Sequence, residues 1–296
     1  MPSKATILKT CLFYAGLAAW VFAVVMAFRG ELLWAGVCAV FALGADVAGR
    51  VWSRRSPVPM PYFMRWILLL PRGPHSPKNL ERVLKPRSGE RILEIGPGVG
   101  VHALPVASLL LPNGVLDVLD VQQEMLDNLA RRAATSGLTN IATKQGDAQK
   151  LPYPDQTFDA AYLIGVLGEI PDPIVAMCEL KRVLKPTGRL VISEILIDPD
   201  FISLKELQEK ARGAGFVLER SSGPGFAYSA VLRPTASTQF VAAGSPRSLL
   251  DDRCSAELRS KEDRRASGAA RTEVMKKRSY SIGNSNALSS RRDSVR

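Results

Sequence analysis

Residues 91–100, Arg-Ile-Leu-Glu-Ile-Gly-Pro-Gly-Val-Gly, are the most informative part of this sequence. Its first half is mostly apolar and predicts a buried strand, and the glycines that follow at alternate positions predict a tight turn. Without a Cβ at Gly96, Gly98 and Gly100, the backbone can approach a ligand closely. Open α/β sheets bind ligands at the carboxyl ends of their strands, beside the next helix N-terminus. The stretch therefore predicts an α/β fold with a ligand site at this turn.

Glu94 lies inside the predicted strand, two residues before the first glycine. A carboxylate there is costly to bury without a partner, and a ligand cation, such as the amino group of an amino-acid moiety, would supply one. The glycine spacing differs from the dinucleotide fingerprint G-x-G-x-x-G/A, whose third small residue would fall on Val101. This spacing disfavours a dehydrogenase.

Further segments fit the same kind of site. Residues 115–120 predict a second strand, and the acid at its end, Asp120, is placed to bind both hydroxyls of a ribose or to cap the next helix. Apolar periodicity over 122–134 predicts that helix, in which Met125 packs either on an adenine or in the core. A short strand over 141–144 then leads to Asp147.

The order Glu-x-Gly-x-Gly-x-Gly at 94–100 resembles motif I of class I S-adenosylmethionine-dependent methyltransferases. The runs 146–159 and 179–190 resemble matching runs in the ubiquinone/menaquinone-biosynthesis type (methyltransferase domain type 11), and the resemblance extends from Ser76 to Pro234. It implies S-adenosylmethionine as the cofactor. It also implies that Asp147 bonds the adenine amino group, although Asp147 could instead only shape a turn.

The fold that follows is a Rossmann-like α/β fold: a seven-stranded sheet, last strand antiparallel, with helices on both faces. The predicted cofactor-binding residues lie at the ends of its strands. They are Glu94, Gly96, Pro97, Gly98, Gly100, Asp120, Val121, Met125, Asp147, Ala148 and Ile164.

On the acceptor side, no Asn-Pro-Pro-Tyr-type motif follows the predicted fourth strand, which disfavours methylation of nucleobase or glutamine amino groups. Related enzymes often carry two histidines where this chain has Gly168 and Glu169. Glu169 is the candidate catalytic residue, against the alternative of a polar loop residue. The four cysteines have no metal-type spacing, so we expect no metal site.

The net charge of +11 comes from basic residues in the two segments that flank the predicted catalytic segment. Residues 77–234 hold 18 basic and 19 acidic side chains, whereas 1–76 hold 8 and 2, and 235–296 hold 13 and 7. This distribution disfavours a specific nucleic-acid partner. The segment 235–296 is rich in Ser and Arg and predicts a disordered tail.

The amino-terminal segment predicts a transmembrane helical hairpin over residues 1–55, with spans at about 10–28 and 32–51. In the second span, Asp46 and Arg50 are spaced for an ion pair on one helix face. Basic residues flank both outer ends, which predicts an integral membrane protein whose catalytic domain faces the cytoplasm. A cleaved signal peptide is the alternative, but it leaves the second apolar run unexplained.

Residues 56–76 predict a Pro-rich connector and an amphipathic helix, which either packs on the core or lies at the membrane interface over the active site. Residues 77–234 form the predicted methyltransferase domain. Together these segments predict a membrane-anchored methyltransferase acting on a small, lipophilic acceptor. A water-soluble acceptor, or a non-catalytic scaffold that binds S-adenosylmethionine, are the alternatives. The sequence does not indicate the oligomeric state.

Overall fold

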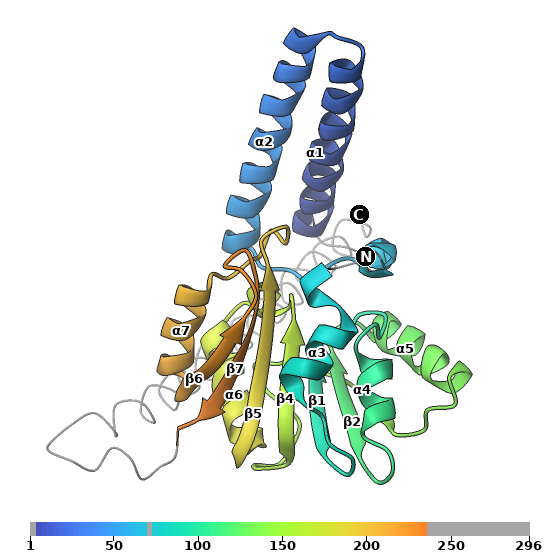
Figure 1. Ribbon diagram of the computed structural model, residues 1–296, viewed down its shortest axis with the longest axis vertical. Helices are drawn as coiled ribbons and strands as arrows, with labels where there is room; N and C mark the ends of the chain where they lie inside the picture. The colour runs from blue at the N-terminus through green and yellow to red at the C-terminus, as the bar shows by residue number, and fades with distance from the viewer. Residues whose placement is uncertain (1–3, 70–72, 236–296) are drawn as a thin grey trace, which may run out of the picture. The chain divides into compact units, whose positions relative to one another are not determined.

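The computed structural model describes residues 4–69 and 73–235 (Figure 1). The predicted disordered tail therefore falls, after Thr235, outside the described residues. Within the described part, amino-terminal helices are followed by an α/β domain that begins near Ser76.

Seven strands form one sheet in the order β3-β2-β1-β4-β5-β7-β6. All strands from β1 to β5 pair in parallel, and β7 runs antiparallel to both of its neighbours, β5 and β6. This confirms the predicted seven-stranded sheet with an antiparallel last strand. The strands are β1 (Arg91–Ile95), β2 (Val115–Asp120), β3 (Ile141–Gln145), β4 (Phe158–Ile164), β5 (Leu184–Ile195), β6 (Phe216–Ser222) and β7 (Ala227–Pro234).

Helices cover both faces of the sheet, with α3 and α4 on the near face in Figure 1 and α6 behind. The helices of the domain are α3 (Pro77–Leu84), α4 (Ala103–Leu109), α5 (Gln123–Thr135), α6 (Pro173–Val183) and α7 (Leu204–Gly213). Three begin at a side chain that accepts a backbone N–H three residues ahead: Ser76 for α3, Asp172 for α6 and Ser203 for α7. Such caps satisfy amide groups that a helix leaves unpaired, so the local sequence sets these starts.

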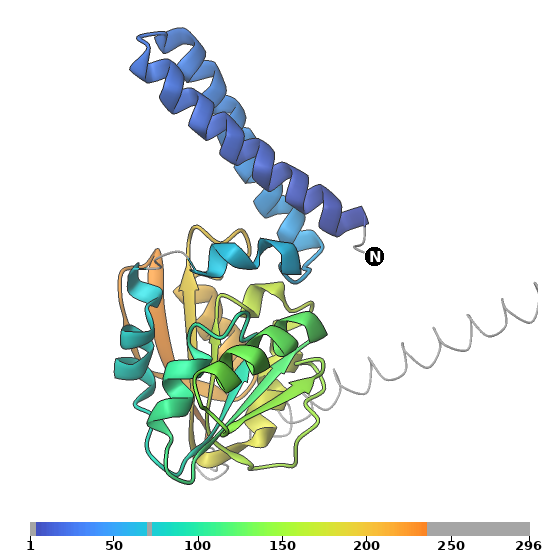
Figure 2. The same cartoon turned by 90° about the vertical axis from the view of Figure 1, so that its right-hand side faces the viewer.

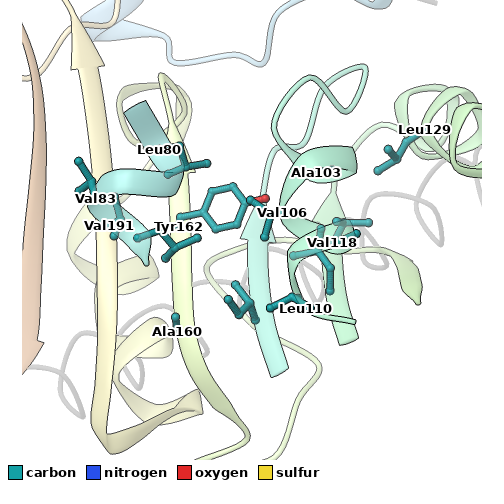
Figure 3. Close-up of a cluster of buried hydrophobic side chains, with 14 of the residues drawn as sticks. Leu80, Val83, Ala103, Val106, Leu110, Val118, Leu129, Ala160, Tyr162 and Val191 are labelled. Atoms are coloured by element: carbon teal, nitrogen blue, oxygen red, sulfur yellow. The ribbon is translucent and has the colours of Figure 1, made fainter. Parts of the chain in front are cut away.

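The core between the sheet and α3, α4 and α5 consists of aliphatic side chains around one aromatic ring. Figure 3 shows that ring, Tyr162 of β4, between Leu80 of α3 and Val106 of α4. Tyr162 is fully buried, so its hydroxyl needs a partner inside the protein. That partner belongs to the candidate site.

Before the domain, the helices α1 (Lys4–Phe28) and α2 (Leu32–Arg55) pack along each other as an antiparallel pair. Within the described residues, α2 is long and apolar enough to cross a membrane, by length and composition only. The apolar helix at 14–28 is shorter. The anticipated pairing of Asp46 with Arg50 is not what the structure shows. Asp46 instead accepts a hydrogen bond from Trp20 Nε1 at 3.1 Å, and Arg50 donates to main-chain carbonyls of the α/β domain.

Within 56–76, where the sequence predicts a connector and an amphipathic helix, the structure has two 3₁₀ segments, η1 (Tyr62–Leu69) and η2 (Gly73–His75). A 3₁₀ helix repeats every three residues, and the exposed positions of η1 follow that repeat at Phe63, Trp66 and Leu69, while Met64 is buried. One side of η1 therefore packs on the protein and another faces outward.

Candidate functional site

The carboxyl ends of the central strands share one edge of the sheet, where main-chain hydrogen bonds hold the following turns in line. Gly96 N donates to Leu119 O at 2.9 Å, and Gly146 N donates to Asp120 O at the same distance. Gly165 N donates to Ser193 O at 2.8 Å. The loops after β1, β2, β3 and β4 therefore open side by side at one edge, as the sequence predicts for a doubly wound sheet.

The turn after β1 requires its glycines. Gly96, Gly98 and Gly100 have φ angles of +66°, +54° and +79°, a region that other residues rarely adopt. A Cβ on Gly98 would lie 2.6 Å from Leu68 Cδ1, and one on Gly96 would lie 2.7 Å from Val166 Cγ2. Both backbone conformation and lack of space thus exclude side chains here.

Glu94 is buried in β1, with 3% of its surface exposed. It accepts a hydrogen bond at 2.8 Å from the hydroxyl of Tyr162, its register partner on β4. Burial raises the pKa of Glu94 to about 8, the Tyr162 hydrogen bond opposes the shift, and the charge of Asp120 adds to it. A positive charge beside this carboxyl group would offset the cost of burying the carboxylate.

Asp120 ends β2 and is also buried. Its Oδ1 accepts from Gln122 N at 2.9 Å, and burial raises its pKa to about 6. Gln122, which precedes α5, in turn donates from Nε2 to Met60 O at 2.8 Å. The end of β2 is thus joined to the connector before η1, a contact that the sequence did not indicate.

The other predicted cofactor residues lie on the same edge but differ in exposure. Asp147 accepts from Gln149 N at 2.8 Å, so it does shape its turn, and Ala148 beside it is buried. Val121 is 48% exposed, whereas Met125 is 2% exposed and packs inside the domain. Ile164 ends β4 and is partly buried. These positions form a row from β1 to β4, but their contact with a cofactor stays a prediction.

The segment η1 lies over the glycine turn, because Leu68 packs on Gly98. Beside this contact is a cavity of about 430 Å³ between η1, the turn and α5. Its lining is apolar apart from two arginines and an asparagine: Phe63, Arg65, Trp66, Leu69, Val99, Asn128 and Arg132. Arg132 also donates to Val99 O, which ties the glycine turn to α5. None of the predicted cofactor residues lines this cavity.

Acidic groups gather where the loops after β4 and β5 meet. Glu169 Oε2 accepts from Met60 N at 3.4 Å, so the connector reaches this loop as well. Glu194, at the end of β5, is 1% exposed, and its Oε1 has no hydrogen-bond partner among the described residues. Its pKa lies well above the usual range, chiefly through burial and then through Asp198, while the N–H of Ile202 opposes the shift. Sequence reasoning missed Glu194, although an acid in an apolar strand is a visible signal.

Both histidines serve in structural hydrogen bonds at this edge. His75 Nε2 lies 2.9 Å from Glu194 O, and His102 Nε2 lies 2.8 Å from His75 O. The two rings are buried and link η2 to β5 and to the start of α4. This arrangement fixes the chain that leads from η1 into α3.

Replacing Glu194 changes how stability depends on pH. The pKa of Glu194 is raised in the folded state, so the folded chain binds more protons than the unfolded chain. The free energy of unfolding therefore falls as pH rises from about 4.5 toward the folded-state pKa. We expect Glu194→Gln to flatten this decline, so that its melting temperature relative to the parent chain is higher at pH 8 than at pH 5. Thermal melts at several pH values measure the difference.

The matched control is Glu219→Gln, because the ion pair with Arg233 lowers the pKa of Glu219. That pair adds stability at pH values above about 4.5 that is lost as pH falls, so the melting temperature of this variant relative to the parent should stay constant between pH 5 and pH 8 and rise only below about pH 4.5. Identical pH profiles for the parent and Glu194→Gln would show that the pKa of Glu194 does not change on folding.

These elements define a doubly wound α/β domain whose glycine turn and buried acids lie at the carboxyl ends of the central strands. Residues 93–192 match the family described as "Methyltransferase domain". The chain thus contains a methyltransferase domain of the class that uses S-adenosylmethionine, and the resemblance noted in the sequence is confirmed.

Named relatives match the same region. A ubiquinone/menaquinone biosynthesis C-methyltransferase of Saccharophagus degradans is 36% identical over 109 residues, 36% of this chain and 44% of the relative. A demethylmenaquinone methyltransferase of Lactobacillus johnsonii is 36% identical over 118 residues, 40% of this chain and 48% of the relative. An uncharacterized 37.1 kDa protein in transposon TN4556 of Streptomyces fradiae is 37% identical over 121 residues, which are 41% of this chain and 33% of the relative. The chain therefore spans less than half the length of these relatives.

Among solved structures, a SAM-dependent methyltransferase from Aquifex aeolicus resembles this chain with a TM-score of 0.55 at 22% identity. The match covers 59% of this chain and 98% of that one. At this identity the likeness supports the fold alone.

Proposed function

We propose that this chain is an S-adenosylmethionine-dependent methyltransferase, anchored in a membrane by its amino-terminal helices, that methylates a small lipophilic acceptor at the cytoplasmic face. The observation that carries the proposal is the buried carboxyl group of Glu94 beside a turn that only glycines can form. A buried acid with a single hydroxyl donor fits the amino group of the cofactor's methionine part.

The remaining predicted residues take the other parts of the cofactor. Asp120 binds the ribose hydroxyls, and Asp147 and Ala148 bind the adenine amino group and ring. Val121, Met125 and Ile164 supply apolar contact. The main chain of Gly96, Pro97, Gly98 and Gly100 passes under the methionine part. When bound, S-adenosylmethionine supplies an activated methyl group on a positively charged sulfur.

The protein then has to align the acceptor with that methyl group and exclude water, because an in-line transfer depends on geometry. Glu169, the proposed acid or base, lies on the loop after β4 with its Oε2 held by the Met60 N–H. A proton acceptor is needed only where the nucleophile carries a proton of high pKa. The connector at Met60 thus contacts both the ribose side, through Gln122, and the acceptor side.

The acceptor class follows from anchoring and from the relatives. A quinone-like acceptor agrees with the quinone-biosynthesis names of the matched relatives. A helix long and apolar enough to cross a membrane would hold the enzyme where such molecules dissolve and raise their effective concentration. An isoprenoid or phospholipid acceptor fits the same argument.

Transfer of a labelled methyl group into a total membrane extract tests this function. We expect label in a lipid-soluble product, whose identification by mass spectrometry names the acceptor. Label only in a water-soluble product would favour the alternative in which the helices serve as an anchor alone. Tight cofactor binding without transfer to any extract would favour a non-catalytic scaffold.

Asp120→Ala tests the ribose contact. We expect the free energy of cofactor binding to weaken by roughly 1–3 kcal/mol, because the ribose hydroxyls lose their acceptor. Asp120→Asn is the matched variant, since its amide oxygen still accepts from Gln122 N but its NH₂ group cannot accept from a hydroxyl. Calorimetric titration measures both, and parent-like affinity in both variants would remove Asp120 from the site.

A further inference from the structure

The outward side of η1 is apolar and unusually exposed. Phe63, Trp66 and Leu69 recur at the three-residue period of a 3₁₀ helix and are 52%, 47% and 61% exposed. On the protein side of the same helix, Met64 is buried and Leu68 packs on Gly98. These three side chains also line the open cavity beside α5, so they add nothing to the core contacts that Met64 and Leu68 make.

A second exposed apolar group lies in loops that follow β5 and join β6 to β7. Leu196, Ile197 and Phe226 are 48%, 81% and 59% exposed, and Leu196 N donates to Phe226 O at 2.7 Å. In Figures 1 and 2 these loops and η1 lie at the same end of the sheet, where β1, β4 and β5 finish. We call the six residues of both groups the apolar rim: Phe63, Trp66, Leu69, Leu196, Ile197 and Phe226.

Both parts of the rim are tied to the carboxyl end of α2. The connector at 56–61 spans at most about 20 Å, which keeps η1 close to the end of α2. Arg50 of α2 donates to Leu196 O at 2.6 Å and to Asp198 O at 2.9 Å, directly at the second group. The last turn of α2 also carries the exposed Arg54 and Arg55.

These features match the composition of a membrane interface. Aromatic side chains prefer the boundary between headgroups and acyl chains, and arginines next to it attract anionic lipid. Exposed apolar residues scattered singly need no explanation, but six that gather at one end beside an apolar helix do.

We propose that the apolar rim rests on the lipid bilayer, so that the edge of the sheet carrying the candidate site faces the membrane. This inference rests on the proposed membrane anchoring by α2. The acceptor would then enter from the lipid between η1 and the loop after β5, without crossing water. The same contact holds η1, and with it Met60 and Leu68, over the site.

Single-tryptophan chains test the contact. Full-length protein with Trp20, Trp34 and Trp52 replaced by Phe keeps Trp66 as its one tryptophan. It is reconstituted in phosphatidylcholine/phosphatidylglycerol vesicles whose acyl chains carry bromine close to the headgroup. We expect the emission of Trp66 to fall about twofold relative to unbrominated vesicles, because bromine quenches tryptophan only on contact. Ile197→Trp in a background with all four tryptophans replaced by Phe should be quenched to a similar extent.

The matched control is Val217→Trp in that same background. Val217 is 51% exposed, similar to Trp66, but it lies near the start of β6, at the end of the sheet opposite to the apolar rim. We expect no quenching there. Emission from Trp66 and Ile197→Trp that is as insensitive to bromine as that of Val217→Trp would overturn the proposal.

A chain that keeps only Trp34 separates this result from the anchoring itself. Trp34 lies in α2, so its quenching reports whether that helix enters the bilayer. Quenched Trp34 with unquenched Trp66 leaves the anchor intact and refutes the docking of the rim. Unquenched Trp34 refutes the anchor. Methyl transfer is measured independently of both.

Discussion

A chain carrying Gly98→Val is expected to lose S-adenosylmethionine binding, with a Kd at least about 100-fold weaker than that of the parent, equivalent to about 2.7 kcal/mol. Two effects add up. The φ of +54° at this position strains any residue with a Cβ, and the Cβ would lie 2.6 Å from Leu68 Cδ1, where η1 covers the turn. The added isopropyl group also fills the space in which the main chain would meet the cofactor. Calorimetric titration measures the affinity.

Two further variants separate these causes. Gly137 has a similar φ of +69°, but no atom lies within 4 Å of the position that a Cβ would take there. Gly137→Val therefore introduces backbone strain without a clash and should bind like the parent. Gly98→Val combined with Leu68→Ala restores room beneath η1. If binding returns in that double variant, displacement of η1 caused the loss, and the proposed path of the cofactor over Gly98 is wrong.

Cofactor affinity is expected to rise steeply with pH, by roughly 20- to 50-fold between pH 6 and pH 7.5. The free protein holds Glu94 with a pKa of about 8 and Asp120 with one of about 6, both raised by burial. A bound ammonium group favours the carboxylate of Glu94, and hydroxyl donors favour that of Asp120. Binding therefore releases protons, and it weakens as pH falls below the pKa values of the free protein.

Calorimetry in buffers of different ionisation enthalpy counts those protons, and we expect roughly one per cofactor at pH 7. Glu94→Gln removes the main titrating group, so its affinity should be low but nearly independent of pH over this range. An equally steep pH profile in Glu94→Gln would show that another group titrates. A flat profile in the parent would mean that Glu94 stays protonated and does not meet a cation.

Much of the fold is already encoded locally. Apolar runs predicted the central strands to within a few residues, and side-chain caps such as Ser76 and Asp172 fix where helices begin. The glycine spacing at 96–100 predicted a tight turn, and the structure has positive φ at all three positions. Within 56–76, where a connector and a helix were predicted, the structure has the 3₁₀ segments η1 and η2.

The candidate site was only partly predictable. Glu94 and Asp120 are visible in the sequence because each acid interrupts an apolar strand. The hydroxyl donor to Glu94 is less visible, since Tyr162 lies 68 positions later and becomes a neighbour only through the pairing of β1 with β4. Side chains alternate between the two faces of a strand, so the sequence of β4 could have placed Tyr162 on the same face as its neighbours two positions away. It could not have placed Tyr162 opposite Glu94.

The α/β class, the glycine turn, its flanking acids and the apolar amino-terminal helices could be predicted from local sequence, because each depends on neighbours within a few residues. Three contacts became visible only in the folded protein: Leu68 covers Gly98, Met60 joins Gln122 to Glu169, and Arg50 binds the loop after β5 instead of Asp46. Those contacts join segments from about 30 to about 150 residues apart. Their partners are chosen by how whole layers pack, a choice that no local pattern of residues encodes.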